Sequence, residues 1–492
     1  MALIGLDIGG TGAKAVAFDS HGEILSYAYE EYDMIQENPG WFEVDPNHIA
    51  QSAFRVLKEC AEKCEDDVLG IGVSSFAESF VLLDENDRVL CNSLMYLDNR
   101  GQEYVDEFTK DRDMEQYRLS SGAYPRLIHS IFRLKVTQKE HPGVLEKVKK
   151  VHFIDSYILS LLGGGHYVDY GIASSTFAFD LIKKEWIPSS IRWAGLDVSK
   201  FPKPVPHGSK VGTLNKDAAQ RLGLKEGIVL CIGGHDHIPS SLGSGIYQKD
   251  TAMNAIGTVE AMMVITDDKD ILTNFPQKGY SLKNHFDPDN YAVMLSGNLT
   301  GGVILKWFRD NLGRLEKQIA ADQGRSFYNE YEKMIPKEPT DLIVIPRFGA
   351  YKEDYANRGS IINLKLSTSA EEIYRAFMEG EAYEMYSSLN EYIKKPDYII
   401  AVNGGANSSI YMQIRADVFN VEVRTIDCPQ PGCLGDAMMA GILAGVFKDV
   451  DDAVKSCVKI KAVYTPDPKR HAYYMKQYDK YRRLSELLSE IK

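Results

Sequence analysis

The stretch GGHDHIPSSLG, Gly233 to Gly243, places an aspartate between two histidines directly after an apolar run. Three roles fit Asp236: a metal ligand beside His235 and His237, a helix cap, or a base that accepts a proton. A zinc site needs a third ligand at motif spacing, and the sequence around the two histidines supplies none. A carboxylate between a strand end and a helix N-terminus is kept ionised by the helix dipole. This stretch by itself is therefore compatible with a base and with a helix cap.

A glycine-rich turn near the N-terminus has the residue types that bind phosphate. Residues 7–14 read DIGGTGAK and separate two apolar, strand-like segments. Glycines let backbone N–H groups approach an anion, Thr11 adds a hydroxyl donor, and Lys14 adds a positive charge. Asp7, at the end of the first segment, is placed to hold magnesium through water. The pattern matches neither a P-loop nor a GxGxxG dinucleotide turn, and a hairpin with a surface lysine is the alternative.

A second glycine cluster, NGGAN at residues 403–407, follows the apolar segment Tyr398 to Val402. After it Ile410, Ile414 and Val418 recur every four residues, which predicts a helix with one apolar face. The cluster therefore lies at a helix N-terminus, where free N–H groups and the helix dipole favour a nucleotide. Glycine at a strand-to-helix turn is also common for geometric reasons alone.

The elements that must position these residues repeat along the chain. Alternating apolar residues predict antiparallel strands at Leu3 to Ile8, Ala13 to Phe18 and Ile24 to Tyr29. Strand, turn and strand recur at residues 252–265, with Gly257 and Thr258 in the turn. We therefore predict an α/β protein of two similar lobes, residues 1–244 and 245–492, the second with a C-terminal helical extension. Helices are predicted over residues 46–62, opened by Asp45, and over residues 119–138 and 144–162.

Composition narrows the class of function. The 492 residues carry 56 basic and 69 acidic side chains, a net charge of -13, which disfavours a nucleic-acid surface and binding to anionic membranes. No apolar run approaches the roughly 18 residues that cross a bilayer, and the N-terminus lacks the basic start of a signal peptide. Seven scattered cysteines, an odd number, favour reduced thiols. We expect a cytoplasmic protein that acts on a small molecule.

Five motifs occur in one order: DIGGTGAKAVAFD, GGHDH, the strand pair around Gly257 and Thr258, LTGGVILKWFRD, and VNGGANSSIYMQIRADVFNVEV. With these motifs the chain resembles, from Ala2 to about Asp449, the FGGY carbohydrate kinases, which include glycerol kinases, xylulokinases and gluconate kinases. The resemblance implies two actin-like, ribonuclease-H-like lobes that bind ATP and a sugar in the cleft between them.

The resemblance also implies roles for the matching residues. Asp236 matches the catalytic aspartate, the general base for the proton of the sugar hydroxyl, and Asp7 matches the residue that faces magnesium. His237 replaces an asparagine or glutamine that commonly touches the sugar. The residues that match the ATP-binding positions are Thr11, Gly12, Lys14, Gly257, Thr258, Gly302, Gly405, Ala406 and Asn407.

The sugar-binding positions depart from the family patterns. Xylulokinases usually carry Met-His, and glycerol kinases carry Arg-Glu, where this chain has Ala77 and Glu78. Residues 96–100, YLDNR, resemble a Trp-x-Asp-x-Arg segment with Tyr96 in place of tryptophan. Within it, Asp98 and Arg100 either line the sugar pocket or pair with each other.

The resemblance implies ATP- and magnesium-dependent phosphorylation of a hydroxyl on a small sugar, polyol or sugar acid. A pentulose such as xylulose is the first expected substrate, and glycerol, a tetritol or gluconate are the alternatives. A non-catalytic, actin-like ATPase switch is a different class of function, but it would have no use for a hydroxyl base at Asp236. Family members are often dimers, so a homodimer is one expected assembly.

Overall fold

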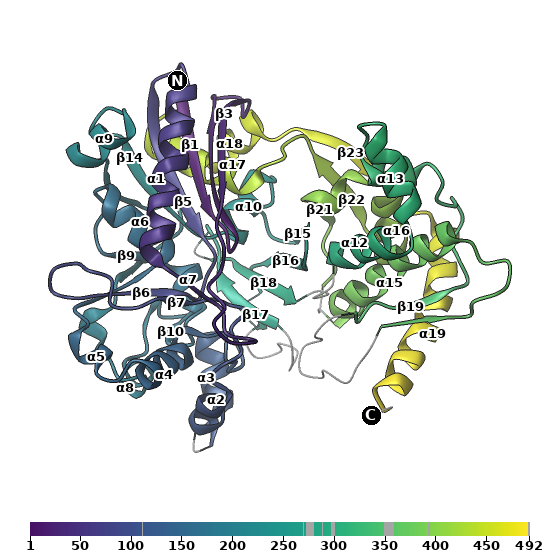
Figure 1. Ribbon diagram of the computed structural model, residues 1–492, viewed down its shortest axis with the longest axis horizontal. Helices are drawn as coiled ribbons and strands as arrows, with labels where there is room; N and C mark the ends of the chain where they lie inside the picture. Colours follow the sequence, from purple (N-terminus) through teal and green to yellow (C-terminus); the bar gives the residue numbers. More distant parts are fainter. Residues whose placement is uncertain are drawn as a thin grey trace.

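The computed structural model describes residues 1–110, 112–268, 270–271, 280–287, 289–296, 301–348, 359–391 and 394–490. Its two large sheets lie in separate lobes, with the purple N-terminal strands in one and the teal and green strands from β15 onward in the other (Figure 1). Helices and strands alternate in both lobes, so the α/β prediction is confirmed.

The first sheet brings several strand ends together. β1 (Ala2–Ile8), β2 (Gly12–Phe18) and β3 (Ile24–Glu31) are the predicted antiparallel strands. β5 (Val68–Ser75) runs parallel to β1, β14 (Val229–His235) runs parallel to β5, and β13 (Lys210–Thr213) forms one edge. Because Ile8, Ser75 and His235 are neighbours in register, the segments after β1 and β14 leave the sheet at the same edge.

Helix α1 (Pro46–Lys63) covers β2 and β3. It begins at the predicted cap, because the Asp45 carboxylate accepts a hydrogen bond of 2.9 Å from the N–H of Asn47. Ile49, Ala53 and Leu57 are buried and lie four residues apart, so one face of the helix packs on the sheet.

The second sheet repeats this plan, so the predicted echo of the N-terminal pattern is confirmed. β15 (Thr251–Ile256) and β16 (Glu260–Thr266) are antiparallel, and β21 (Tyr398–Val402) and β22 (Glu422–Ile426) continue the sheet in parallel from β15. The remaining strands are β17 (Tyr280–Asn284), β18 (Tyr291–Ser296) and β23 (Ile460–Tyr464). The main helices are α12 (Gly301–Asn311), α15 (Ala370–Glu391), α16 (Ser409–Phe419) and α19 (Pro468–Glu490). No helix in the described ranges combines the length and the apolar character that a membrane crossing requires.

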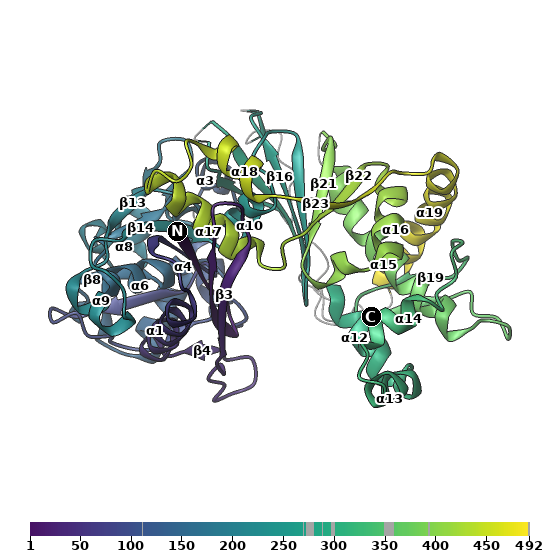
Figure 2. The same cartoon turned by 90° about the horizontal axis from the view of Figure 1, so that it is seen from above.

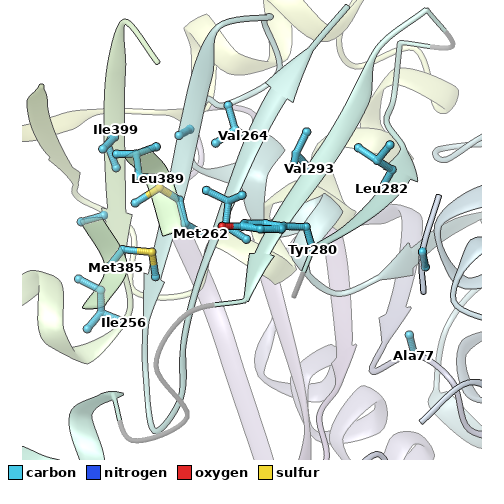
Figure 3. Packing of buried hydrophobic residues seen from close by; sticks show 14 of the residues in the cluster. Ala77, Ile256, Met262, Val264, Tyr280, Leu282, Val293, Met385, Leu389 and Ile399 are labelled. Carbon is cyan, nitrogen blue, oxygen red and sulfur yellow. The ribbon is translucent and has the colours of Figure 1, made fainter. Parts of the chain in front are cut away.

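The apolar core of the second lobe extends into the first. Figure 3 shows Met262, Tyr280 and Val293 on neighbouring strands, with Met385 of α15 beside them. The same cluster includes Ala77, which follows β5 in the first lobe. The lobes therefore share a core on the side where β17 lies.

A helix from the later half of the chain packs on the first sheet. α17 (Pro431–Leu443) lies against β1 and β5, although in the sequence it comes between β22 and β23 of the second sheet (Figure 2). A Cβ atom at Gly5 would lie 1.9 Å from the carbonyl oxygen of Cys433, and one at Gly72 would lie 2.2 Å from that of Asp436, so this approach requires glycine. The domain bounds 1–244 and 245–492 stay a prediction. α17 belongs to the second of these ranges in sequence, but it packs on the sheet of the first lobe.

Two segments that were each predicted as one helix are divided into several elements in the structure, so both predictions are wrong. Residues 119–138 contain the end of α3 (Met114–Ser121) and most of α4 (Ser130–Glu140), because Gly122, with a φ of 67°, ends α3. Residues 144–162 contain α5 (Val144–Lys147), β8 (Lys150–Phe153) and α6 (Ile154–Leu162). β8 pairs with β6 (Phe80–Leu83), so a long-range pairing outweighs the helical pattern there.

Candidate active site

The turn between β1 and β2 holds a pair of opposite charges. Asp7 and Lys14 are opposite in the antiparallel register, and Lys14 Nζ lies 3.1 Å from Asp7 Oδ2. The N–H of Gly9 donates to the carbonyl oxygen of Gly12 at 2.9 Å, which closes the turn, and Thr11 is exposed within it. The Asp7 carboxylate raises the pKa of Lys14, so the lysine stays a cation beside the turn.

One oxygen of Asp7 is suited to a metal. Asp7 Oδ1 is buried and has no hydrogen-bond partner among the described residues. Burial raises the pKa of Asp7, Lys14 opposes that effect, and the charge of Asp236 raises the pKa further. A divalent cation would compensate both the burial and the repulsion between the carboxylates, and magnesium prefers carboxylate oxygen. The residues present therefore fit magnesium.

Asp236 lies where β14 ends and α10 (His237–Gly243) begins. Gly234 shapes this end of the strand, because its φ is 80° and a Cβ atom there would lie 2.1 Å from Cγ of Asp169. The N–H of Asp236 donates to the carbonyl oxygen of Ser75 at 3.0 Å, which ties it to the end of β5. The Asp236 side chain makes no capping hydrogen bond to α10, so the cap alternative is wrong.

Two histidines contact the Asp236 carboxylate. Nδ1 of His237 lies 2.8 Å and Nδ1 of His235 lies 3.0 Å from Oδ1 of Asp236. Burial alone would raise the pKa of Asp236, but His237 and the bonds from both histidines hold that pKa well below its usual range. Burial alone would lower the pKa of His237, but Asp236 outweighs it and raises the pKa. Asp236 is thus an ionised carboxylate, and its side chain is 32% exposed.

The same three side chains could hold a metal by proximity alone. His235, Asp236 and His237 each bring a ligand atom to within 4.8 Å of the others. Tetrahedral zinc with bonds of about 2.0 Å would hold its ligand atoms about 3.3 Å apart. The separations of 2.8 and 3.0 Å are those of hydrogen bonds instead. This geometry favours an aspartate that is hydrogen-bonded and ready to accept a proton.

Glu78 lies within electrostatic reach of Asp236. It has a φ of 69°, and Ser130 Oγ donates to its carbonyl oxygen at 2.7 Å. Burial raises the pKa of Glu78, Lys283 opposes this most strongly, and Asp236 adds to the rise. Ala77, the other residue of this predicted sugar turn, is buried in the core shared by the lobes.

Tyr96 lies next to the turn between β1 and β2 and within electrostatic reach of Asp236 and Glu78. A Cβ atom at Gly10 would lie 2.9 Å from the Tyr96 hydroxyl, and the Tyr96 ring packs edge-on against Phe76 with centroids 6.3 Å apart. Burial, Asp236 and Glu78 all raise the pKa of Tyr96. The structure therefore brings Tyr96 together with Glu78 and Asp236, as the sequence predicted.

Asp98 and Arg100 pair with each other. Nη2 of Arg100 lies 2.7 Å from Oδ2 of Asp98 and 2.7 Å from Oε1 of Glu43, and the guanidinium stacks on Trp41 at 4.2 Å. Asp98 is buried and accepts a hydrogen bond of 2.8 Å from the N–H of Phe42. Of the two alternatives, the structure therefore shows that Asp98 and Arg100 pair with each other. Contact of either residue with a sugar stays a prediction.

A cavity of about 480 Å³ in the second lobe is lined by the two later glycine turns. The N–H of Gly302 donates to the carbonyl oxygen of Gly257 at 2.8 Å, which joins α12 to the turn after β15. Ala406 packs against the core, and Leu299 and Thr300 of the LTGG motif lie outside the described residues. The predicted residues that line the cavity are Gly257, Thr258, Gly302, Gly405 and Asn407.

Sequence reasoning missed the side chains that form the rest of this cavity. Most of them come from α12, α14 (Phe327–Glu332), α15 and α16. Lys306 and Tyr411 lie within two of the motifs, but helical spacing does not say which face meets a cavity. A larger cavity of about 650 Å³ shares Asn329, Glu332 and Ile335 with it, and none of the predicted site residues lines that one. The missed residues include Lys306, Tyr328, Glu332, Tyr374 and Met378.

Comparison with known proteins agrees with this geometry. Residues 2–243 match the N-terminal domain, and residues 252–444 the C-terminal domain, of the FGGY family of carbohydrate kinases. The chain is 24% identical to the xylulose kinase of Bacillus subtilis, covering 98% of this chain and 96% of that one, and 26% identical to its gluconokinase, covering 94% and 91%. The crystal structure of xylulose kinase from Rhodospirillum rubrum superposes with a TM-score of 0.87 at 25% identity, covering 100% and 99%.

Proposed function

We propose, since the chain belongs to the FGGY family of carbohydrate kinases, that Asp236 is its general base and that a pentulose is its acceptor. The observation that carries the first part is the ionised Asp236 carboxylate beside the turn that holds Asp7 and Lys14. The xylulose kinases among its relatives support a pentulose. A gluconokinase and a glycerol kinase of similar identity keep gluconate and glycerol as alternatives.

Asp236 accepts the proton of the acceptor hydroxyl as the bond to phosphorus forms. Both histidines contact Oδ1, and Oδ2 has no hydrogen-bond partner in the described part of the chain. Oδ2 is therefore the oxygen that receives the proton. The histidines keep Asp236 ionised, and they orient the carboxylate through the other oxygen.

The turn between β1 and β2 binds the transferred phosphoryl group. Lys14 supplies a positive charge, and Thr11 and the N–H groups at Gly12 and its neighbours donate to the phosphate oxygens. Asp7 would hold magnesium, which would neutralise charge on the phosphate groups. The cavity lined by Gly257 and Gly405 binds the adenosine.

The experiment is ADP release with and without a panel of D-xylulose, D-ribulose, glycerol, erythritol and D-gluconate. We expect ATP turnover to be strongly stimulated by one acceptor, with the pentuloses first. A phosphorylated product is then identified by mass spectrometry. ATP turnover that no acceptor changes would favour the ATPase switch and overturn the proposed function.

Replacing His237 by asparagine should move the acid limb of the pH profile to higher pH. His237 lowers the pKa of Asp236, so its loss raises that pKa, and Asp236 becomes protonated at a less acid pH. The measurement is kcat/KM against pH for the wild type and His237→Asn, with exposed His21→Asn as the control. An acid limb that stays in place in His237→Asn would contradict this coupling.

A further inference from the structure

An edge strand of the second sheet reaches into the first lobe. The N–H of Leu282 in β17 donates to the carbonyl oxygen of Gly122 at 2.8 Å, and Asn284 Nδ2 donates to that of Leu181 at 3.2 Å. Tyr280 and Leu282 belong to the shared core, as Figure 3 shows. Because side chains alternate along a strand, Lys283 lies on the opposite face from these two.

Lys283 is a buried lysine within electrostatic reach of Glu78 and Asp236, two residues of the proposed site. Its side chain is 5% exposed, and its Nζ donates to Oγ of Ser175, at the end of α7 (Tyr170–Ser174). Burial lowers the pKa of Lys283, and the charges of Glu78, Asp169 and Asp236 oppose that effect. Within the described ranges, Ser175 is its one hydrogen-bond partner, and no carboxylate is close enough to form an ion pair with it.

The carboxylates around Lys283 differ in what already binds them. Asp169 accepts hydrogen bonds from the N–H groups of Gly171 and Ile172. It also lies 3.1 Å from Nδ1 of His207. The Asp236 carboxylate contacts Nδ1 of both His235 and His237. The Glu78 carboxylate has no such partner among the described side chains, and Lys283 is the strongest of the positive charges that act on it.

A buried ammonium and a half-buried carboxylate that do not bond each other carry a desolvation cost that no ion pair offsets. Hydroxyl groups between them remove that cost, because a hydroxyl oxygen accepts from the ammonium and a hydroxyl hydrogen donates to the carboxylate. A substrate carboxylate would instead add a negative charge beside Glu78 and Asp236. The arrangement thus suits an uncharged polyhydroxy compound.

We propose that Lys283 is a specificity-determining residue that, opposite Glu78, binds hydroxyl or carbonyl oxygens of a neutral ketose or polyol and disfavours sugar acids. The proposal rests on the proposed function and names its substrate class. Lys283 reaches the site from the second lobe, so it also links acceptor binding to the relative position of the lobes.

The test is Lys283→Met, which keeps much of the side-chain length without the charge. For the best neutral acceptor of the panel we expect KM to rise about 10- to 100-fold, as for loss of a hydrogen bond to a charged group, with KM for ATP unchanged. Wild-type kcat/KM should favour D-xylulose or D-ribulose over D-gluconate. The matched control is Lys249→Met, an exposed lysine that pairs with Asp267, and its KM values should equal those of the wild type.

Stability without substrate separates a binding role from a structural one. Removing an ammonium that is buried without an ion pair should leave the Tm of Lys283→Met unchanged or higher, whereas loss of a structural contact would lower it. Lys283→Gln, which keeps a donor for Ser175, should show the same rise in acceptor KM.

Three outcomes would overturn the proposal while leaving the kinase function intact: an unchanged acceptor KM in both variants, a lower Tm in both, or a wild-type preference for D-gluconate that Lys283→Met abolishes. The last outcome would show that Lys283 binds a carboxylate. Failure of every acceptor to stimulate the wild-type protein would instead refute the proposed function itself.

Discussion

Replacing Asp236 by asparagine should lower kcat about 100- to 10,000-fold, the usual loss when a general base is removed. Asparagine has the same shape, but its amide cannot take the proton of the acceptor hydroxyl. Since the turn at Asp7 and the cavity at Gly257 stay unchanged, KM for ATP should stay close to the wild-type value. Steady-state kinetics with the best acceptor measures both parameters.

The control for this variant is Asp67→Asn, which changes an exposed aspartate that pairs with Lys225 and should leave kcat unchanged. Acceptor-stimulated turnover in Asp236→Asn at the wild-type rate would show that the proton leaves by another route. In that case Asp236 would not be the base, and its contacts with His235 and His237 would need a structural explanation.

Replacing Arg415 by methionine should destabilise the second lobe by about 3–5 kcal/mol, because it leaves a buried carboxylate without its partner. Arg415 and Glu260 have fully buried side chains, and Arg415 Nη2 lies 3.0 Å from Oε2 of Glu260. Arg415 Nη1 also donates to Oδ1 of Asn254 at 3.0 Å. Denaturant unfolding, followed by a probe in the second lobe, measures the change.

This buried network also supports the proposed nucleotide cavity. Glu260 begins the strand that follows Thr258, and Tyr411, which bonds Arg415, lines the cavity. We therefore expect KM for ATP to rise in Arg415→Met at temperatures where the protein is still folded. Both effects begin with the loss of the Arg415 guanidinium: the Glu260 carboxylate is left without its partner, and the adjoining turn at Gly257 is displaced.

Two variants test this explanation. Arg424→Met removes a half-buried arginine that pairs with Glu422 on the same sheet, and it should cost less than about 1 kcal/mol, as exposed pairs do. Adding Glu260→Gln to Arg415→Met should recover part of the lost stability, because the carboxylate without a partner is then gone. A double variant no more stable than the single one would contradict the charge argument.

Local patterns in the sequence predicted the parts of the fold that depend on neighbouring residues. Alternation predicted β1 to β3, and a capping aspartate predicted the start of α1 at Pro46. The likeness of two strand–turn–strand patterns predicted two similar sheets. The same reasoning failed at β8, where helical periodicity was present but pairing with β6 decided the conformation.

In the candidate site, too, some features follow from residues that are adjacent in sequence and others depend on the folded chain. Asp236 could be placed at a strand end next to a helix because the apolar run and the helix are adjacent to it in sequence. Its low pKa depends on His235 and His237, which are adjacent as well, but the orientation of the two rings is a property of the folded chain. The sequence leaves two alternatives for Asp98 and Arg100, and only the folded chain shows that they pair, at 2.7 Å, with Glu43 and Trp41 also contacting the guanidinium.

By itself, then, the sequence determined the fold class, the family resemblance and the segments that bear the chemistry, because periodicity, caps and glycine turns are short-range properties of a chain. Only the tertiary structure placed Lys283 within electrostatic reach of Glu78 and brought Glu332 and Tyr374 to the cavity at Gly257. These partners come from distant segments, and which distant groups meet depends on how sheets and helices pack, which no local pattern specifies.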